Sequence, residues 1–199
     1  MEWVEVLAGT RVIVGLPEAA IDDLIAAGEV LVQEGLTAWT VPVSRHAELP
    51  RLRSVFGGRV RLGVGDLRDP GQVRLARDVE PDLLLSPFAS EDVLRAAEST
   101  PIALGALTPA EIARALELGP AAVQVTPCDA LGSLYARTVT DLFAGEPLIA
   151  TGKLERFQCE MWLDAGALAV CPVGLVGAAD VADPDLADLR RRARAHRLG

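Results

Sequence analysis

The sequence predicts a single-domain α/β protein, a (β/α)8 TIM barrel that spans residues 1–199. Short apolar runs alternate with longer amphipathic runs, this unit occurs eight times, and no linker or low-complexity stretch divides the chain. Short strands without polar alternation are typical of a parallel sheet covered on both faces. An open doubly wound sheet fits the same alternation, but the count of eight favours the closed barrel.

The predicted strands are short apolar segments bounded by turn-forming residues. They lie at 11–15, 38–43, 59–63, 83–85, 102–104, 121–125, 148–150 and 168–171. The predicted helices follow them in order, at 17–33, 48–56, from 69, 90–97, from 108, 131–143, 154–165 and after 184. The C-terminal arginines complement the dipole of the last helix.

Helix boundaries are marked by capping residues. Gly35 ends the helix 17–33, as a C-terminal glycine cap does. Asp69 precedes a proline and Ser90 precedes an acidic turn, so each is expected to be an N-cap. Thr108 and Glu111 have the spacing of a capping box, with proline at the first helical position. These residues therefore place helix ends between the predicted strands.

Composition excludes several classes of function. The chain is half hydrophobic and carries a net charge of −9 with a pI near 4.7, so neither nucleic acid nor an anionic membrane is expected as a partner. Its three cysteines are widely spaced and its two histidines far apart, so we expect neither a metal site nor a disulfide framework. No signal-peptide pattern or membrane-spanning run is found, and a cytoplasmic protein is expected.

Lys153 is the only lysine, against eighteen arginines. It follows a short apolar strand, where an ammonium group can form a Schiff base, bind an anion or act as a general base. A surface lysine in a turn is the simpler interpretation of this local pattern. In a barrel, however, the carboxyl ends of the strands meet at one mouth, so Lys153 joins other chemically useful residues there. Those residues, taken as candidates for the site, are Thr40, Ser44, Arg45, Asp66, Pro87, Thr108, Gln124, Thr151 and Gly152.

In order and spacing, the strand ends resemble the 2-keto-3-deoxy-6-phosphogluconate / 4-hydroxy-2-oxoglutarate aldolase family. The matching pieces are Gly35-Leu36, Gly63-Val64-Gly65, Ser86-Pro87, Gly105, Thr108-Pro109-x-Glu111, Pro127 with Asp129, and Thr151-Gly152. The resemblance implies a class I, metal-free and cofactor-free aldolase on a TIM barrel, typically a homotrimer, that uses a lysine Schiff base with pyruvate.

The chain departs from this family at its catalytic positions. The Schiff-base lysine expected two residues before the strand 6 proline falls on Gln124 or its immediate neighbour, and the general-acid glutamate of strand 2 falls on Thr40. The substrate-carboxylate arginine falls on Ser44, next to Arg45. The second glycine of the strand 7 phosphate loop is Lys153.

Two hypotheses follow. In the first, the Schiff-base amine has moved to Lys153 on strand 7, Asp66 or Asp129 supplies the proton transfer, and a non-phosphorylated 2-oxo acid is the substrate. In the second, the aldolase chemistry is lost. The barrel then binds a small anion through Lys153 and the amides of Thr151 and Gly152, or serves as an oligomeric scaffold.

The position of Lys153 discriminates between these hypotheses. A Schiff base needs the amine inside the mouth, and an anion site needs it directed at the loop between strands 7 and 8. A scaffold predicts a filled mouth, with Trp39 and Phe88 as candidate plugs.

Overall fold

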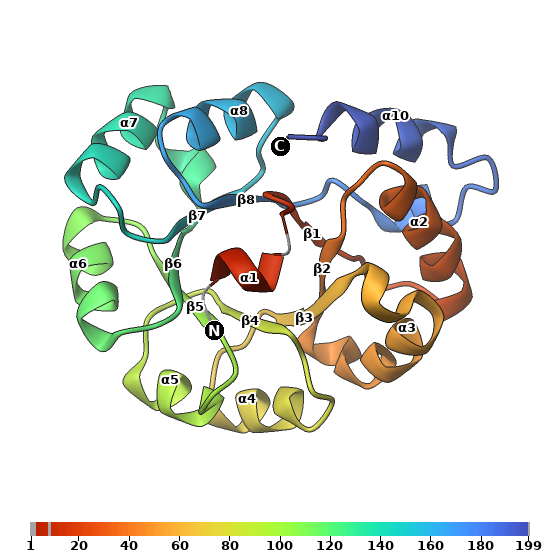
Figure 1. The fold of residues 1–199 in the computed structure, drawn as a ribbon, viewed down its shortest axis with the longest axis horizontal. Helices are drawn as coiled ribbons and strands as arrows, with labels where there is room; N and C mark the ends of the chain where they lie inside the picture. The colour runs from red at the N-terminus through yellow and green to blue at the C-terminus, as the bar shows by residue number, and fades with distance from the viewer. Residues whose placement is uncertain (1–2, 8, 199) are drawn as a thin grey trace.

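The chain folds into a barrel of eight parallel strands surrounded by helices (Figure 1). The computed structural model describes residues 3–7 and 9–198. The strands neighbour one another in chain order, and a parallel bridge between Val12 and Val170 joins the last strand to the residue before the first. The strands are β1 (Ile13–Gly15), β2 (Ala38–Pro42), β3 (Arg61–Gly65), β4 (Leu83–Ser86), β5 (Ile102–Ala106), β6 (Ala122–Val125), β7 (Leu148–Gly152) and β8 (Ala169–Pro172). The predicted TIM barrel is therefore confirmed.

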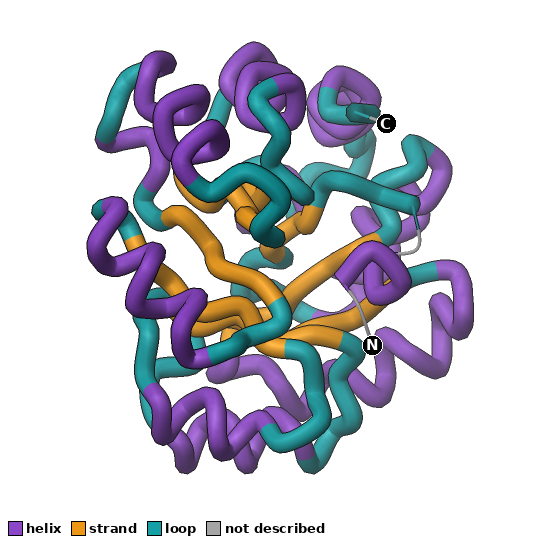
Figure 2. Tube along the Cα trace, turned by 60° about the vertical axis from the view of Figure 1, so that its left-hand side comes forward, coloured by secondary structure: helices purple, strands orange, loops and turns teal. Residues whose placement is uncertain are grey.

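The helices form a layer outside the strands, as the two ribbon views show (Figures 1 and 2). They are α2 (Ile21–Gln33), α3 (Leu49–Phe56), α4 (Pro70–Arg77), α5 (Glu91–Ala97), α6 (Pro109–Leu118), α7 (Ser133–Leu142), α8 (Arg156–Asp164), α9 (Ala178–Val181) and α10 (Ala187–Ala195). Short 3-10 turns η1 (Val43–Glu48), η2 (Gly57–Arg59) and η3 (Cys128–Ala130) complete the connections. No helix of the described ranges has the length and apolar character needed to cross a membrane.

The predicted caps form as expected. Asp69 accepts a hydrogen bond from the Gln72 amide at 2.9 Å, and Thr108 and Glu111 make the reciprocal capping box of α6. Gly35 follows α2 with a φ of +79°, which glycine adopts without steric cost.

Some boundaries differ from the sequence prediction. The segment before Ile21 is not helical, and residues 43–48 form a 3-10 turn ahead of α3. Strand β7 continues through Gly152 instead of turning at Thr151, because it pairs with β8 as far as Pro172. Helices α1 (Trp3–Leu7) and α9 were not predicted, since each is only one turn long and too short for a periodic signal.

Alternate strand residues face the barrel interior and the helix layer. Along β7, Ile149 belongs to the inner cluster of buried side chains, whereas Leu148 and Ala150 pack in the outer one. Many inward positions are small; they include Ala38, Gly63, Ala103, Gly105, Ala122 and Ala169. Such side chains leave space along the barrel axis.

Helix α1 fills part of this space. It precedes β1 and appears inside the ring of strands in Figure 1. Trp3, Val6 and Leu7 are each 2% exposed and pack against the inner cluster. The amino-terminal end of the barrel is therefore closed by α1, and the open space remains at the carboxyl ends of the strands.

Candidate functional site

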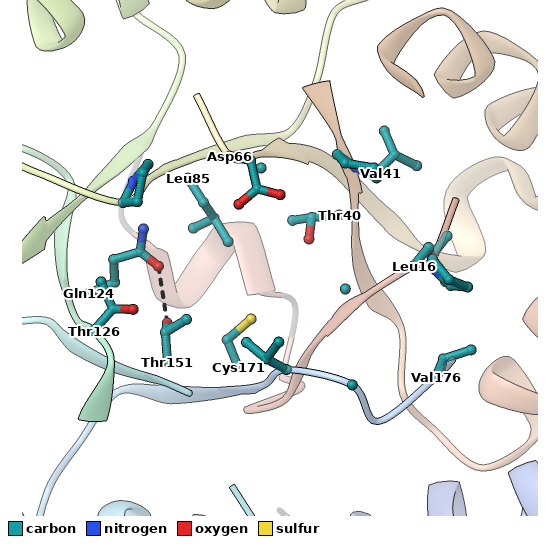
Figure 3. A pocket seen from close by; sticks show the side chains of 17 residues that line it. Leu16, Thr40, Val41, Asp66, Leu85, Gln124, Thr126, Thr151, Cys171 and Val176 are labelled. Carbon is teal, nitrogen blue, oxygen red and sulfur yellow. Dashed lines mark hydrogen bonds between the residues drawn. The ribbon is translucent and has the colours of Figure 1, made fainter. Parts of the chain in front are cut away.

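A cavity of about 360 Å³ occupies the mouth of the barrel (Figure 3). The residues that line it come from the ends of most strands and from the loops that follow them. Its polar side chains are those of Thr40, Asp66, Gln124, Thr126, Thr151 and Cys171. A concave hollow with a few converging polar groups is the usual form of a small-molecule site. The mouth is not filled by side chains.

Gln124 is held by a buried hydrogen-bond network. It faces inward from β6 and is 4% exposed. Its Nε2 donates to the backbone carbonyl of Ser86, and its Oε1 accepts a 3.0 Å hydrogen bond from the Thr151 hydroxyl (Figure 3). An amide satisfied on both ends is fixed in orientation. Gln124, which the sequence resemblance aligned at or next to the family's lysine position, is thus a neutral side chain that is fixed in orientation.

Of the described residues that line the mouth cavity, Asp66 alone has a charged side chain. It directly follows β3 and has a φ of +60°, a left-handed conformation that aspartate tolerates better than most residues. Figure 3 shows its carboxylate directed into the cavity, across from Cys171. Within the part of the chain that the structure describes, Arg and Lys side chains make no salt bridge to it.

Cys171 lies on β8, beside Thr151 in the register of the two strands. Burial, and then the negative charge of Asp66, raise the pKa of its thiol to about 12. The thiol is therefore neutral at physiological pH and is no activated nucleophile.

Thr126 and Cys171 line the cavity but were not among the candidate site residues. Both carry a signal that was available in the sequence. Thr126 immediately follows the sixth strand, and Cys171 continues the inward alternation that begins at Ala169.

Lys153 lies outside the cavity lining. Its side chain is exposed, and its backbone N–H donates to Asp129 Oδ1 at 3.1 Å. The strand ends at Gly152, and the chain bends at Lys153 before α8 begins. Asp129 also approaches Gly152 closely, because a Cβ at that position would lie 2.2 Å from its Oδ1. Asp129 therefore ties the loop after β6 to the end of β7.

The candidate residues divide into two groups. Thr40, Asp66, Pro87, Gln124 and Thr151 line the cavity as predicted. Ser44, Arg45, Thr108, Gly152 and Lys153 do not.

The residues outside the cavity have structural partners. The Ser44 hydroxyl donates to Glu18, and Arg45 binds the Ala19 carbonyl at 2.7 Å and Glu48 at 3.2 Å. Thr108 caps α6.

The two aromatic plug candidates do not fill the mouth. Trp39 is fully buried on the outer side of β2, where its ring lies 4.8 Å from that of Phe56 and its Nε1 donates to Leu36. Phe88 is 44% exposed and lines a neighbouring hollow. Side chains alternate along β2, which turns Trp39 away from the barrel axis, so neither of these aromatic residues plugs the mouth.

Residues 4–191 match the family model for KDPG and KHG aldolase. The chain belongs to this family. The described residues contain no group of three or more His, Cys, Asp or Glu side chains that could hold a metal ion. A search of curated proteins gave no match.

Solved structures show the same fold. The family's 2-keto-3-deoxy-6-phosphogluconate aldolase from Zymomonas mobilis ATCC 29191 is 20% identical, with a TM-score of 0.84 over 98% of this chain and 96% of that one. The KDPG aldolase from Legionella pneumophila, described with pyruvate captured as a covalent carbinolamine, is 18% identical, with a TM-score of 0.84 over 98% of each chain. The 4-hydroxy-2-oxoglutarate aldolase/2-deydro-3-deoxyphosphogluconate aldolase from TTHB1 is 26% identical, with a TM-score of 0.81 over 99% and 98%.

Proposed function

We propose that this aldolase-family protein binds a small molecule noncovalently in the mouth of its barrel and forms no Schiff base there. The observation that carries the proposal is the Gln124 side chain. It stands on β6 with both ends of its amide engaged, by Ser86 and Thr151. An amide cannot condense with a ketone to an iminium, because its nitrogen lone pair is delocalised into the carbonyl. Among the described residues that line the cavity, none carries an amine.

A second candidate is a class I aldolase for a 2-oxo acid of the pyruvate type, with Lys153 as the nucleophile and Asp66 as the proton-transfer group. One observation favours it. Ile149 and Thr151 face inward along β7, and Lys153 is the next residue in that series, one position beyond the end of the strand. A rotation of the exposed side chain over the rim would then be required to bring Nζ to a bound carbonyl.

Borohydride trapping with pyruvate tests both candidates. An amine that attacks pyruvate forms an iminium with loss of water, and the hydride from borohydride reduces it to a stable secondary amine. We expect no adduct on Lys153 by intact mass and peptide mapping, while an authentic family aldolase is labelled in the same experiment. Peptide mapping also separates Lys153 from the α-amino group of the chain. An adduct on Lys153 that is absent in Lys153→Ala would overturn the proposal and establish the second candidate.

The oligomeric state is a further part of the proposal. We infer a homotrimer, as the family resemblance implies. An exposed apolar surface on α7 and α8 supports self-association: Leu134 is 76% and Phe157 is 70% exposed, and both border a hollow between the two helices. Multi-angle light scattering should give three times the chain mass, and Phe157→Asp should lower it. A monomeric mass at micromolar concentration would contradict the trimer.

A cytoplasmic location remains our prediction.

A further inference from the structure

The mouth cavity has an unusual charge for a family whose name and solved members point to acidic substrates. Among its lining residues the single formal charge is negative, on Asp66. No arginine or lysine is found among the lining residues that the structure describes. A carboxylate ligand placed in this cavity would therefore meet a like charge without a compensating cation. The net charge of −9 on the whole chain opposes the approach of an anion as well.

In the loop after β7, the backbone N–H of Lys153 is also not free to bind an anion. The backbone N–H of Lys153 is occupied by Asp129 Oδ1 at 3.1 Å. The same carboxylate oxygen lies 2.2 Å from the position that a Cβ on Gly152 would take. The chain thus places its own carboxylate against the turn that a phosphate or carboxylate would have to approach, and Asp129 repels such a group.

The hollow next to the mouth does not supply the missing cation. It shares Pro87 and Thr126 with the mouth cavity and contains Arg114 and Glu111. Arg114 pairs with Glu117 at 2.9 Å, and Glu111 accepts hydrogen bonds from the amides of Leu107 and Thr108. Positive charge in this hollow is therefore already balanced by neighbouring carboxylates.

The groups that remain free in the mouth suit hydroxyl groups. Asp66 accepts hydrogen bonds only, and the hydroxyls of Thr40 and Thr126 both donate and accept. Thr40 and Asp66 lie near each other on the rim shared by β2 and β3, and Thr126 lies on the opposite side beside Gln124 (Figure 3). The inward-facing Leu85 side chain supplies apolar lining for the carbon skeleton of a ligand (Figure 3).

We propose that the mouth binds an uncharged polyhydroxylated molecule of about four to six carbons, such as a sugar or a sugar alcohol, with Asp66 accepting hydrogen bonds from its hydroxyls. The cavity volume of about 360 Å³ accommodates a molecule of this size. This inference rests on the proposed function, noncovalent binding in the mouth, and names its ligand class.

The test compares two ligands that differ in one charge. Xylitol and xylonate have the same number of carbons, and only xylonate carries a carboxylate. Binding to the full chain is followed by ligand-observed NMR and by titration of the Thr40 and Thr126 methyl resonances, which locate the ligand in the mouth. We expect xylitol to bind at least tenfold more tightly than xylonate, and pyruvate to leave both methyl resonances unshifted.

Asp66→Asn separates charge from shape. It keeps an oxygen acceptor but removes the charge, so the xylitol affinity should fall by about tenfold, because a hydrogen bond to a neutral acceptor is weaker than one to a carboxylate. The same variant should reduce the preference for xylitol over xylonate. Asp78→Asn removes an exposed charge at the end of α4, remote from the mouth, and serves as the matched control with unchanged binding.

Two results would overturn the inference. One is tighter binding of xylonate or pyruvate than of xylitol. The other is no shift of the Thr40 and Thr126 methyl resonances with xylitol at 50-fold the concentration at which xylonate or pyruvate saturates the protein. Neither result bears on the Schiff base, which is read from the borohydride adduct on Lys153. The proposed ligand class and the proposed noncovalent binding are therefore tested by different experiments, and either can be contradicted without the other.

Discussion

Asp129 Oδ1 accepts a 3.1 Å hydrogen bond from the backbone N–H of Lys153, and this contact joins the loops that follow β6 and β7. It explains why the only lysine of the chain is anchored by its backbone at the rim while its side chain remains exposed. It also places a carboxylate beside Gly152, where any side chain would collide with it.

Asp129→Ala should loosen this connection. The Lys153 amide loses its acceptor, and water replaces it only in part, so the free energy of unfolding should fall by about 1 kcal/mol. Asp129→Asn retains the Oδ1 acceptor and should behave nearly as the natural chain. Urea denaturation of both variants measures the difference. Equal losses in the two variants would mean that the charge, and not the hydrogen bond, stabilises the loop.

Gly152→Ala should act through the same contact. The new Cβ would displace the Asp129 carboxylate, since the two atoms would otherwise be 2.2 Å apart. The cost of Gly152→Ala should therefore be smaller when Asp129 is already alanine, with a coupling of about 1 kcal/mol in a double-mutant cycle. Additive effects in the cycle would contradict this explanation.

Gly105→Ala should lower the stability more than Gly152→Ala does, because the added Cβ would meet the Pro87 backbone, which cannot move aside as a side chain can. The added Cβ would lie 2.1 Å from the backbone oxygen of Pro87, in the loop that covers β5. We expect a loss of at least about 2 kcal/mol, typical of forced overpacking. Gly58→Ala is the matched control, since its Cβ meets no atom within 4 Å. Thermal unfolding of both variants tests the difference, and equal melting temperatures would refute the close approach.

Thr151→Val should destabilise the network at the base of the mouth. The substitution removes the donor of the 3.0 Å hydrogen bond and leaves the Gln124 oxygen short of a partner in a buried site, at a cost of about 1–2 kcal/mol. Thr138→Val, whose hydroxyl donates to Leu134 on the exposed surface of α7, should change stability much less. Chemical denaturation of the two valine variants makes the comparison. A smaller loss for Thr151→Val would show that Gln124 finds another donor.

The ion pairs of Glu34 with α10 predict that the stability of this C-terminal helix depends on pH. Its side chain is 5% exposed and pairs with Arg194 at 3.1 Å and Arg190 at 3.4 Å on α10. The hydrogen bond from Arg194 is the main cause that lowers the pKa of Glu34 below its usual value of 4.5. A lowered pKa in the folded state contributes stability that is present above pH 4.5 and is lost as pH falls through the folded pKa.

Hydrogen exchange in α10 should therefore accelerate as pH falls below 4.5, after correction for the intrinsic rate. Glu34→Gln should remove this part of the pH dependence, and Glu91→Gln, on the exposed face of α5, should leave it intact. An unchanged acid response in Glu34→Gln would assign the effect to other carboxylates.

Several features of the fold could be read directly from the chain. The alternation of apolar and amphipathic segments gave the number and order of strands, and local caps such as Asp69 and Thr108 gave helix starts. These signals depend on neighbours within a few residues, so they need no knowledge of distant contacts. The five predicted residues that line the cavity follow from the same order, because parallel strands bring their carboxyl ends together.

Other positions depended on register and on where the chain bends. Strand β7 runs two residues beyond its predicted end because β8 pairs with it, and this moves Lys153 past the rim of the cavity. Arg45 was one residue away from a substrate position in sequence, yet it binds the Ala19 carbonyl in the loop before α2. Small inward side chains were visible in the sequence, but not that α1 would occupy the space they leave.

The sequence by itself determined the (β/α)8 barrel, its caps and the kinds of residue at the strand ends, because each is encoded by local periodicity. Only the tertiary structure decided that Gln124 is fixed by Ser86 and Thr151, that Asp66 faces the cavity, and that Lys153 does not line it. The physical reason is that a side chain's direction at the end of a strand depends on pairing and loop contacts between residues far apart in the chain.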